Sequence, residues 1–250
     1  MTESYRALCS DSYVNAKLNV KMELPRGRET VLEFFERVRK QYPGMSSFRR
    51  YREELALESC QTDTPHRWLA VRSNNIRAGS VNAPNFEGAY GLHELVFETA
   101  PYFLNISPLD VDFVELLYGF DLAASGNHDA IVFETLMGSS PLARLIESRD
   151  ATPIECQPLI GLTFGSRADI EVYFEVKTRA GGSAAPRDPE NPQDPISVYL
   201  TLRKFGAAQE LKDLPAALTR LAARGEELVE SCVVPTLLVP LRDAIASGGS

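Results

Sequence analysis

Apolar and polar side chains alternate almost without error over residues 13–24, near the start of the chain. One set is Val14, Ala16, Leu18, Val20, Met22 and Leu24, and the other is Asn15, Lys17, Asn19, Lys21 and Glu23. Because successive side chains of a strand point to opposite faces, this pattern predicts a long strand with one buried and one hydrated face. A hydrated face is typical of antiparallel sheets, since parallel sheets are usually covered on both sides.

The rest of the chain shows similar patterns. Predicted strands lie at 47–58, 67–73, 76–82, 110–122, 154–164, 170–176 and 196–202, with an interruption of the strand 154–164 at Pro158. Helices are predicted at 26–42, 85–100, 128–137 and 213–246, with Asn85 and Asn127 as N-caps and a short helical piece at 141–147. Pro235 and Pro240 are expected to break or kink the last helix. The Gly- and Pro-rich segment 180–195 is expected to be a disordered loop.

The order of these elements is the same in both halves of the chain: strand, helix, three strands, helix. We therefore expect an α+β fold in which antiparallel strands carry helices on one face. The predicted halves are 1–105 and 106–250, joined in one compact domain, and the second half ends in the long C-terminal helix. The expected duplication rests on element order alone, because the two halves share no repeat at the level of residues.

Composition narrows the class of protein. Residues 1–105 hold 14 basic and 13 acidic groups, so the net charge of −8 comes from residues 106–250. This balance disfavours nucleic acid as a general partner.

Apolar runs fall short of the roughly 20 residues that cross a bilayer, and the first residues lack a signal-peptide pattern, so we expect a cytoplasmic protein without membrane contact. Four dispersed cysteines and three histidines match no metal motif, and we expect neither a metal nor a cofactor.

Three residues are the candidates for acid–base catalysis. Glu115 lies among apolar neighbours on the strand at 110–122, where desolvation would raise its pKa unless a cation pairs with it. His128 and Asp129 open a helix, where an anion could bind. The simpler interpretation is that Asn127 caps this helix and that Asp129 interacts favourably with the positive end of its dipole.

The hydrated face of the first half is the candidate binding surface. It is predicted to carry a basic stripe with an aromatic residue between the charges: Lys17, Lys21, Arg50, Arg52, Arg72 and Trp68, with Arg77 as a further candidate. Basic strands with interleaved aromatics can bind nucleic acid or an acidic partner. The alternative is a solvated face on which Glu23, Glu54 and Glu58 pair with these charges across the strands.

The chain resembles a sporadically distributed family of uncharacterised bacterial proteins. The matching features are the opening strand 13–24, the helix that ends at Gln41-Tyr42-Pro43, the hairpin 68–81 with its following helix, and the strand 196–204 before the terminal helix. The element order also resembles the TATA-binding-protein-like layout, a curved antiparallel sheet with helices on one face. These resemblances imply an α+β fold and a bacterial protein.

Since no catalytic motif stands out, we expect a non-enzymatic protein-binding or adaptor module that uses its exposed sheet face. One alternative is a small hydrolase or transferase with Glu115, His128 and Asp129 in its site. Another is a small protein that holds an apolar ligand beneath Leu218, Leu221, Leu228 and Val229. A protein partner is expected, while the oligomeric state is left open by the sequence.

Overall fold

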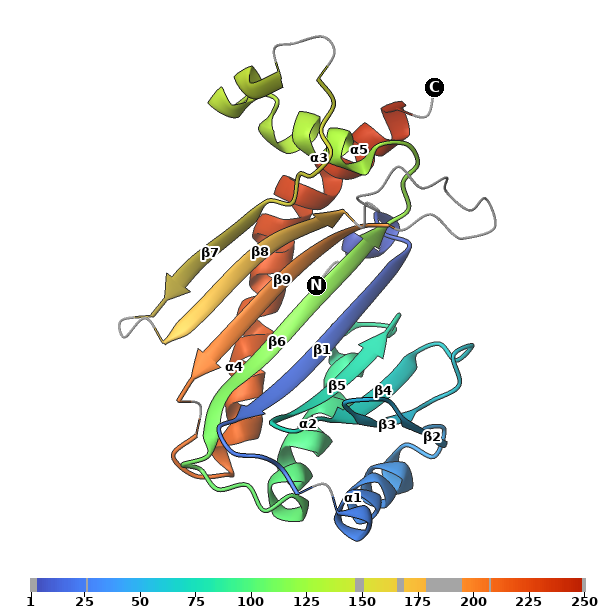
Figure 1. Ribbon diagram of the computed structural model, residues 1–250, viewed down its shortest axis with the longest axis vertical. Coiled ribbons are helices and arrows are strands. Elements are labelled where there is room, and N and C mark those ends of the chain that lie inside the picture. Colours follow the sequence, from blue (N-terminus) through green and yellow to red (C-terminus); the bar gives the residue numbers. More distant parts are fainter. Residues whose placement is uncertain are drawn as a thin grey trace.

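The computed structural model describes residues 4–25, 27–146, 151–165, 169–178, 195–206 and 208–248. In these residues nine strands form one antiparallel sheet in the order β2-β3-β4-β5-β1-β6-β9-β8-β7 (Figure 1). The strands are β1 (Asp11–Val20), β2 (Ser47–Arg50), β3 (Leu55–Glu58), β4 (His66–Val71), β5 (Asn75–Val81), β6 (Val111–Leu122), β7 (Leu159–Phe164), β8 (Ile170–Thr178) and β9 (Ile196–Phe205).

The helices lie between and after these strands. They are α1 (Arg28–Gln41), α2 (Phe86–Phe103), α3 (His128–Met137), α4 (Asp213–Leu228) and α5 (Val239–Gly248), with 3-10 turns η1 (Ser4–Ala7) and η2 (Pro141–Ile146) and a π-helical segment η3 (Val229–Leu238). Asn85 and Asn127 cap α2 and α3 as predicted, since their side chains accept hydrogen bonds from the backbone N–H groups of Gly88 and Ala130.

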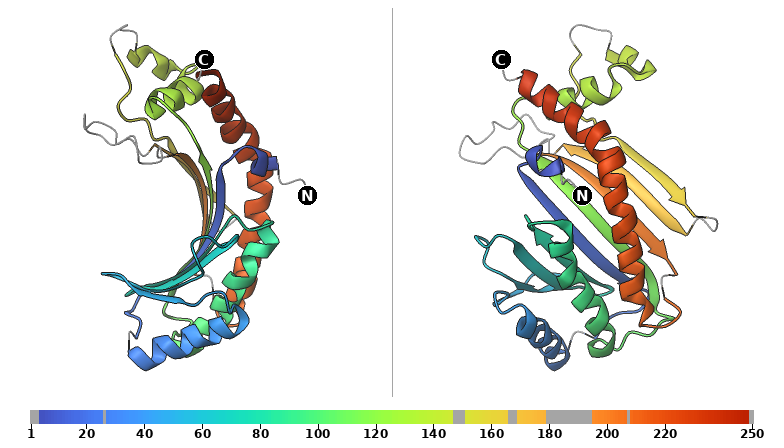
Figure 2. Two further views of the ribbon diagram at one scale, coloured as in Figure 1. Left: turned by 90° about the vertical axis from the view of Figure 1, so that its right-hand side faces the viewer. Right: turned by 180° about the vertical axis from the view of Figure 1, so that it is seen from behind.

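The sheet is curved, and α2, α4 and η3 pack on its convex face (Figure 2). The apolar residues of β1 and β6 point toward these helices, and Val14, Leu18 and Leu116 are at most 3% exposed. Tyr118 of β6 joins the two layers, because its hydroxyl donates to the carbonyl of Ala222 in α4 at 3.2 Å. The structure confirms the predicted α+β class, with an antiparallel sheet and helices on one face.

The first strand is shorter than predicted. Residues 13–20 alternate as expected, but the pairing of β1 with β6 shifts register between Asn19 and Val20. The chain then bends, and Met22, for which the alternation predicts an inward position, is 70% exposed. Its backbone N–H is held by the Asp110 carboxylate at 2.8 Å instead of by a neighbouring strand.

Three other segments differ from their predictions. Of the predicted strand 154–164, only Leu159–Phe164 forms a strand, β7. Residues 47–58 form two short strands, β2 and β3, which pair as a hairpin from Ser47 opposite Glu58 to Arg50 opposite Leu55. The C-terminal helix is not broken at Pro235. Instead it widens into η3 and continues into α5, and this wider turn accommodates a residue that has no N–H to donate.

The two halves meet at the centre of the sheet, where β1 lies beside β6. The first half has four strands after its helix and the second has three, so the structure does not confirm the predicted duplication. Residues 105 and 106, where the predicted halves divide, lie in the connection between α2 and β6, and strands of both halves belong to the one sheet. Of the predicted loop 180–195, all but Pro195 lies outside the described residues. No described helix combines the length and the apolar character that a membrane span requires.

Candidate binding surface

The concave face of the sheet is the face opposite the helices, and charged residues form a row across it. The register pairs Arg77 of β5 with Lys17 of β1, then Lys17 with Glu115 of β6, and Glu115 with Arg203 of β9, which also lies opposite Glu171 of β8. We call these five residues the central row. Because directly paired residues of antiparallel strands point to the same face, all five side chains share the concave side.

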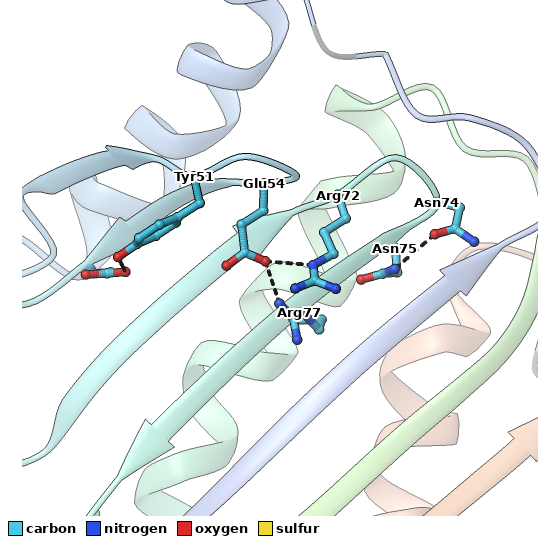
Figure 3. A network of polar contacts seen from close by, with 7 residues as sticks. Tyr51, Glu54, Arg72, Asn74, Asn75 and Arg77 are labelled. Carbon is cyan, nitrogen blue, oxygen red and sulfur yellow. Dashed lines mark hydrogen bonds and ion pairs between the residues drawn. The ribbon is translucent and has the colours of Figure 1, made fainter.

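Most of the charges in and beside this row are paired. Arg203 donates two hydrogen bonds to Glu115, at 3.0 and 2.6 Å, and its guanidinium is 3.8 Å from Glu171. At the other end, Glu54 accepts from Arg77 at 2.5 Å and from Arg72 at 2.7 Å (Figure 3).

Lys17 lies between these two paired groups. Among the described residues its ammonium has no ion pair and no hydrogen bond, and it sits 5.1 Å from the centre of the Phe113 ring. Partial burial lowers the pKa of Lys17; Glu115 opposes this shift, while the charges of Arg203, Arg77 and Arg72 add to it. The central row together with Glu54 and Arg72 holds four basic and three acidic groups, so Lys17 is the cation that these acids leave without a partner.

Two other polar atoms beside Lys17 lack partners. The side-chain oxygen Oδ1 of Asn15, two residues before Lys17 on the same strand, is buried and has no hydrogen bond within the described part of the chain. The same holds for Nε of Arg77, opposite Lys17. Buried polar atoms are usually hydrogen-bonded, so these two atoms are unsatisfied polar functions beside the half-exposed Lys17 ammonium.

Aromatic rings surround the central row. Half-buried or nearly buried rings on the concave face are Tyr13, Trp68, Phe113, Tyr173, Tyr199 and Phe205. Arg77 lies 5.7 Å from the Trp68 ring, and Arg203 lies 4.6 Å from Phe113. Such cation–π contacts fix the cations against the sheet.

Two glycines bring these rings close to the backbone of the sheet. A Cβ atom added to Gly79 would lie 2.4 Å from the Trp68 ring, and one added to Gly119 would lie 2.1 Å from the Tyr13 ring. Each ring therefore lies across the glycine of the neighbouring strand, where a side chain would otherwise stand. The concave face thus combines aromatic surface with fixed cations.

The structure brings together part of the predicted basic stripe. Lys17 and Trp68 lie on the concave face, and Arg72 lies beside it through its pair with Glu54. Lys21 follows the end of β1 and donates to the carbonyl of Leu109 at 3.1 Å. Arg50 is opposite Leu55, on the side of the helices, and Arg52 is exposed in the turn between β2 and β3.

Several residues of this surface were not predicted from the sequence. Arg49, not Arg50, points to the concave side, where it pairs with Glu58 at 3.2 Å. Arg203, Tyr173 and Phe113 belong to the second half of the chain. Their alternation along β6, β8 and β9 was a signal that could have placed them on the face opposite the helices, but only the pairing of β1 with β6 and of β6 with β9 brings Phe113 and Arg203 close to Lys17.

The three candidate catalytic residues do not form one site. Glu115 lies mid-strand in an ion pair with Arg203, whereas His128 and Asp129 start α3. Leu122, at the end of β6, lies seven positions beyond Glu115, which is about 23 Å along the strand. His128 is 6% exposed, with Nε2 3.2 Å from the carbonyl oxygen of Ala124.

Asp129 has a structural role in the fold. It is 2% exposed and accepts hydrogen bonds from Thr178 Oγ1 at 2.6 Å and from the backbone N–H of Cys156 at 2.8 Å. It thereby ties the start of α3 to the end of β8 and to the segment before β7.

The remaining alternative concerned an apolar ligand beneath the C-terminal helix. Leu218, Leu221, Leu228 and Val229 are at most 5% exposed and pack into the main hydrophobic core. Among the described residues no group of three or more His, Cys, Asp or Glu side chains is placed to hold a metal ion.

Comparison of the chain with protein-family models and with curated protein sequences finds no match. The resemblance to a bacterial family and the TATA-binding-protein-like layout therefore stay predictions.

Proposed function

We propose that this protein is a non-enzymatic binding module whose concave sheet face binds an extended acidic segment of a protein partner. The observation that carries the proposal is the position of Lys17, a half-buried cation without an ion pair in the described residues, between the paired groups of Arg77 and Arg203. A carboxylate from a partner would supply the missing acceptor and restore the pKa that burial lowers.

The surroundings of Lys17 favour a peptide as the bound molecule. The rings of Trp68 and Tyr13 offer apolar contact area on either side of the strand that carries Asn15 and Lys17. Aromatic residues and arginines are the side chains that contribute most to protein–protein interfaces. A nucleic acid is less well matched, because Glu115 and Glu171 interrupt the row of cations that would follow a phosphate backbone.

Trp68 is the only tryptophan of the chain, so its fluorescence reports on this face alone. The test is a titration with a synthetic peptide of alternating glutamate and leucine. We expect a saturable change in emission, and we expect Lys17→Met to weaken binding about tenfold or more, as for loss of a hydrogen bond to a charged group.

The matched control is Lys21→Met, which removes the same charge four residues away, outside the concave face. It should bind like the wild type. Equal affinity of the Lys17→Met and wild-type proteins would overturn the assignment of Lys17. Tighter binding of an oligothymidylate than of the acidic peptide would instead replace the proposed partner class with nucleic acid.

A further inference from the structure

The two edge strands of the sheet differ in their charged and apolar residues. The edge strand β2 has four residues, of which two are arginines, and charged side chains are a usual protection against pairing with another chain. The opposite edge strand, β7, has the sequence LIGLTF with no charge and no proline. Leu159, Ile160 and Leu162 are 58%, 58% and 45% exposed.

The hydrogen-bonding groups of β7 alternate between the sheet and solvent. The backbone N–H of Val176 in β8 donates to the carbonyl of Pro158 at 2.9 Å, so residues 160, 162 and 164 also direct their backbone groups toward β8. Leu159, Gly161 and Thr163 direct theirs outward, where β7 has no neighbouring strand among the described residues.

We propose that β7 pairs with β7 of a second copy of this chain, antiparallel and around a two-fold axis at Gly161. Gly161 then faces Gly161 of the second copy as a hydrogen-bonded pair, and Leu159 faces Thr163. This register connects the outward N–H and C=O groups of all three residues. It also keeps the concave faces of both copies on one side, so the two sheets join into one continuous sheet through β7, the edge strand of each copy (labelled for one copy in Figure 1).

The side chains fit this register as well. Ile160 of one copy lies opposite Leu162 of the other on the helix-bearing face, in a pair without backbone hydrogen bonds, where side chains approach most closely. The two such pairs form one apolar cluster around the axis. Because the protein carries a net charge of −8, two copies repel each other. β7 has no charged residue, so pairing through β7 brings no like charges of this strand face to face.

The two-fold pairing is closed, because it uses the β7 edge of each copy and leaves only the arginine-bearing β2 edges. The expected product is thus a dimer and not a fibre. In this register the five residues 159–163 of each copy pair with one another, which is a small seam for a stable interface, so association should depend on concentration in the micromolar to submillimolar range.

Sedimentation equilibrium tests the proposal. The mass of the wild type should rise from 27.7 kDa toward twice that value with concentration. Two variants should stay monomeric. Leu162→Lys places two ammonium groups, one from each copy, in the apolar cluster. Gly161→Pro removes an outward N–H group and breaks no hydrogen bond to β8. The control Leu109→Lys changes an 87% exposed leucine outside β7 and should dimerise like the wild type.

Amide hydrogen exchange locates the seam. In concentrated wild-type protein, exchange at Gly161 and Thr163 should slow compared with dilute protein, whereas Ile160 and Leu162, bonded to β8, should be protected at both concentrations. A protein that stays at 27.7 kDa throughout, or a dimer that survives both β7 substitutions, overturns the proposal. So does a dimer in which exchange at Gly161 and Thr163 is unchanged.

Discussion

Arg203 donates two hydrogen bonds to the same carboxylate oxygen of Glu115, from Nε at 3.0 Å and from Nη2 at 2.6 Å. This pair joins β9 to β6 on the concave face and occupies the acid that lies directly opposite Lys17. It therefore accounts for two features at once. Glu115 is an ion-pair partner instead of a free general acid. Lys17 has no ion pair with Glu115, the acid opposite it.

The first prediction follows from this competition for Glu115. Glu115→Gln removes the negative charge beside Lys17 and leaves both Lys17 and Arg203 to attract an acidic ligand. We expect affinity for the glutamate–leucine peptide to rise about two- to fivefold, the size of a partly exposed charge contact. Fluorescence titration of Trp68 measures it.

The control for this variant is Glu94→Gln, which removes an equal charge from an exposed position of α2 on the other side of the sheet. It separates a local effect from a change in net charge. Equal gains in both variants would mean that long-range attraction, and not the site at Lys17, governs binding.

The second prediction concerns Asp129 as a structural residue. Asp129→Ala leaves the N–H of Cys156 and the hydroxyl of Thr178 without their acceptor, so the free energy of unfolding should fall by about 1–3 kcal/mol. Thr178→Val deletes one of the two donors, so it should lower the free energy of unfolding less than Asp129→Ala does. Urea denaturation at neutral pH measures both, with Asp243→Ala as the control, since Asp243 is exposed and its carboxylate has no hydrogen bond or ion pair among the described residues. An unchanged stability of Asp129→Ala would contradict the structural role.

The third prediction tests how Trp68 lies on the sheet. In Gly79→Ala the new methyl group would stand 2.3 Å from Oδ1 of Asn15 and 2.4 Å from the Trp68 ring, so both side chains must move. We expect the tryptophan emission to shift and the free energy of unfolding to fall by about 1–3 kcal/mol. Gly27→Ala is the matched control, since its nearest atom would be 3.8 Å away. Identical emission spectra of the two variants would show that the ring does not lie across Gly79.

Local pattern was enough to predict most elements of this fold. Alternation in residues 13–20 and the Asn85 and Asn127 caps predicted β1, α2 and α3 to within a few residues, because these signals depend only on neighbours in the chain. The end of β1 was missed, since it is set by the register shift against β6. The continuation of the last helix past Pro235 depends likewise on packing of η3 against the sheet.

The candidate surface could be predicted only in part, because the sequence pattern of one strand does not show which strands pair with it. Lys17 and Trp68 could be assigned to a hydrated face from their own strands. The partners that define the site, Glu115 and Arg203, are about 100 and 190 residues from Lys17 along the chain, and antiparallel pairing of three strands brings them together. The missed turn between β2 and β3 was enough to select Arg50 in place of Arg49, because one continuous strand would put Arg50 and Leu55 on opposite faces whereas the hairpin pairs them on the same face.

A fourth prediction concerns His93, which lies in α2 and is completely buried. Neither ring nitrogen has a hydrogen-bond partner within the described residues. Burial lowers the pKa of His93 from 6.5 to about 3, and a contact with the backbone of Val14 opposes this shift only in part. The imidazole is therefore neutral in the folded protein at every pH above this value, although the unfolded chain protonates it below 6.5.

The unfolded state thus binds more protons than the folded state between pH 6.5 and about 3, so the free energy of unfolding falls as the pH falls through this window. From about pH 7 to about pH 5 the contribution of His93 is a loss of about 2 kcal/mol. His93→Leu replaces the imidazole with an apolar side chain of similar size that does not titrate. Between pH 7 and pH 5 the free energy of unfolding of this variant should therefore fall about 2 kcal/mol less than that of the wild type. Urea denaturation at both pH values measures the difference, and comparing the two proteins cancels the carboxylates that also titrate. Parallel losses in wild type and variant would show that His93 is protonated inside the folded protein or exposed to water.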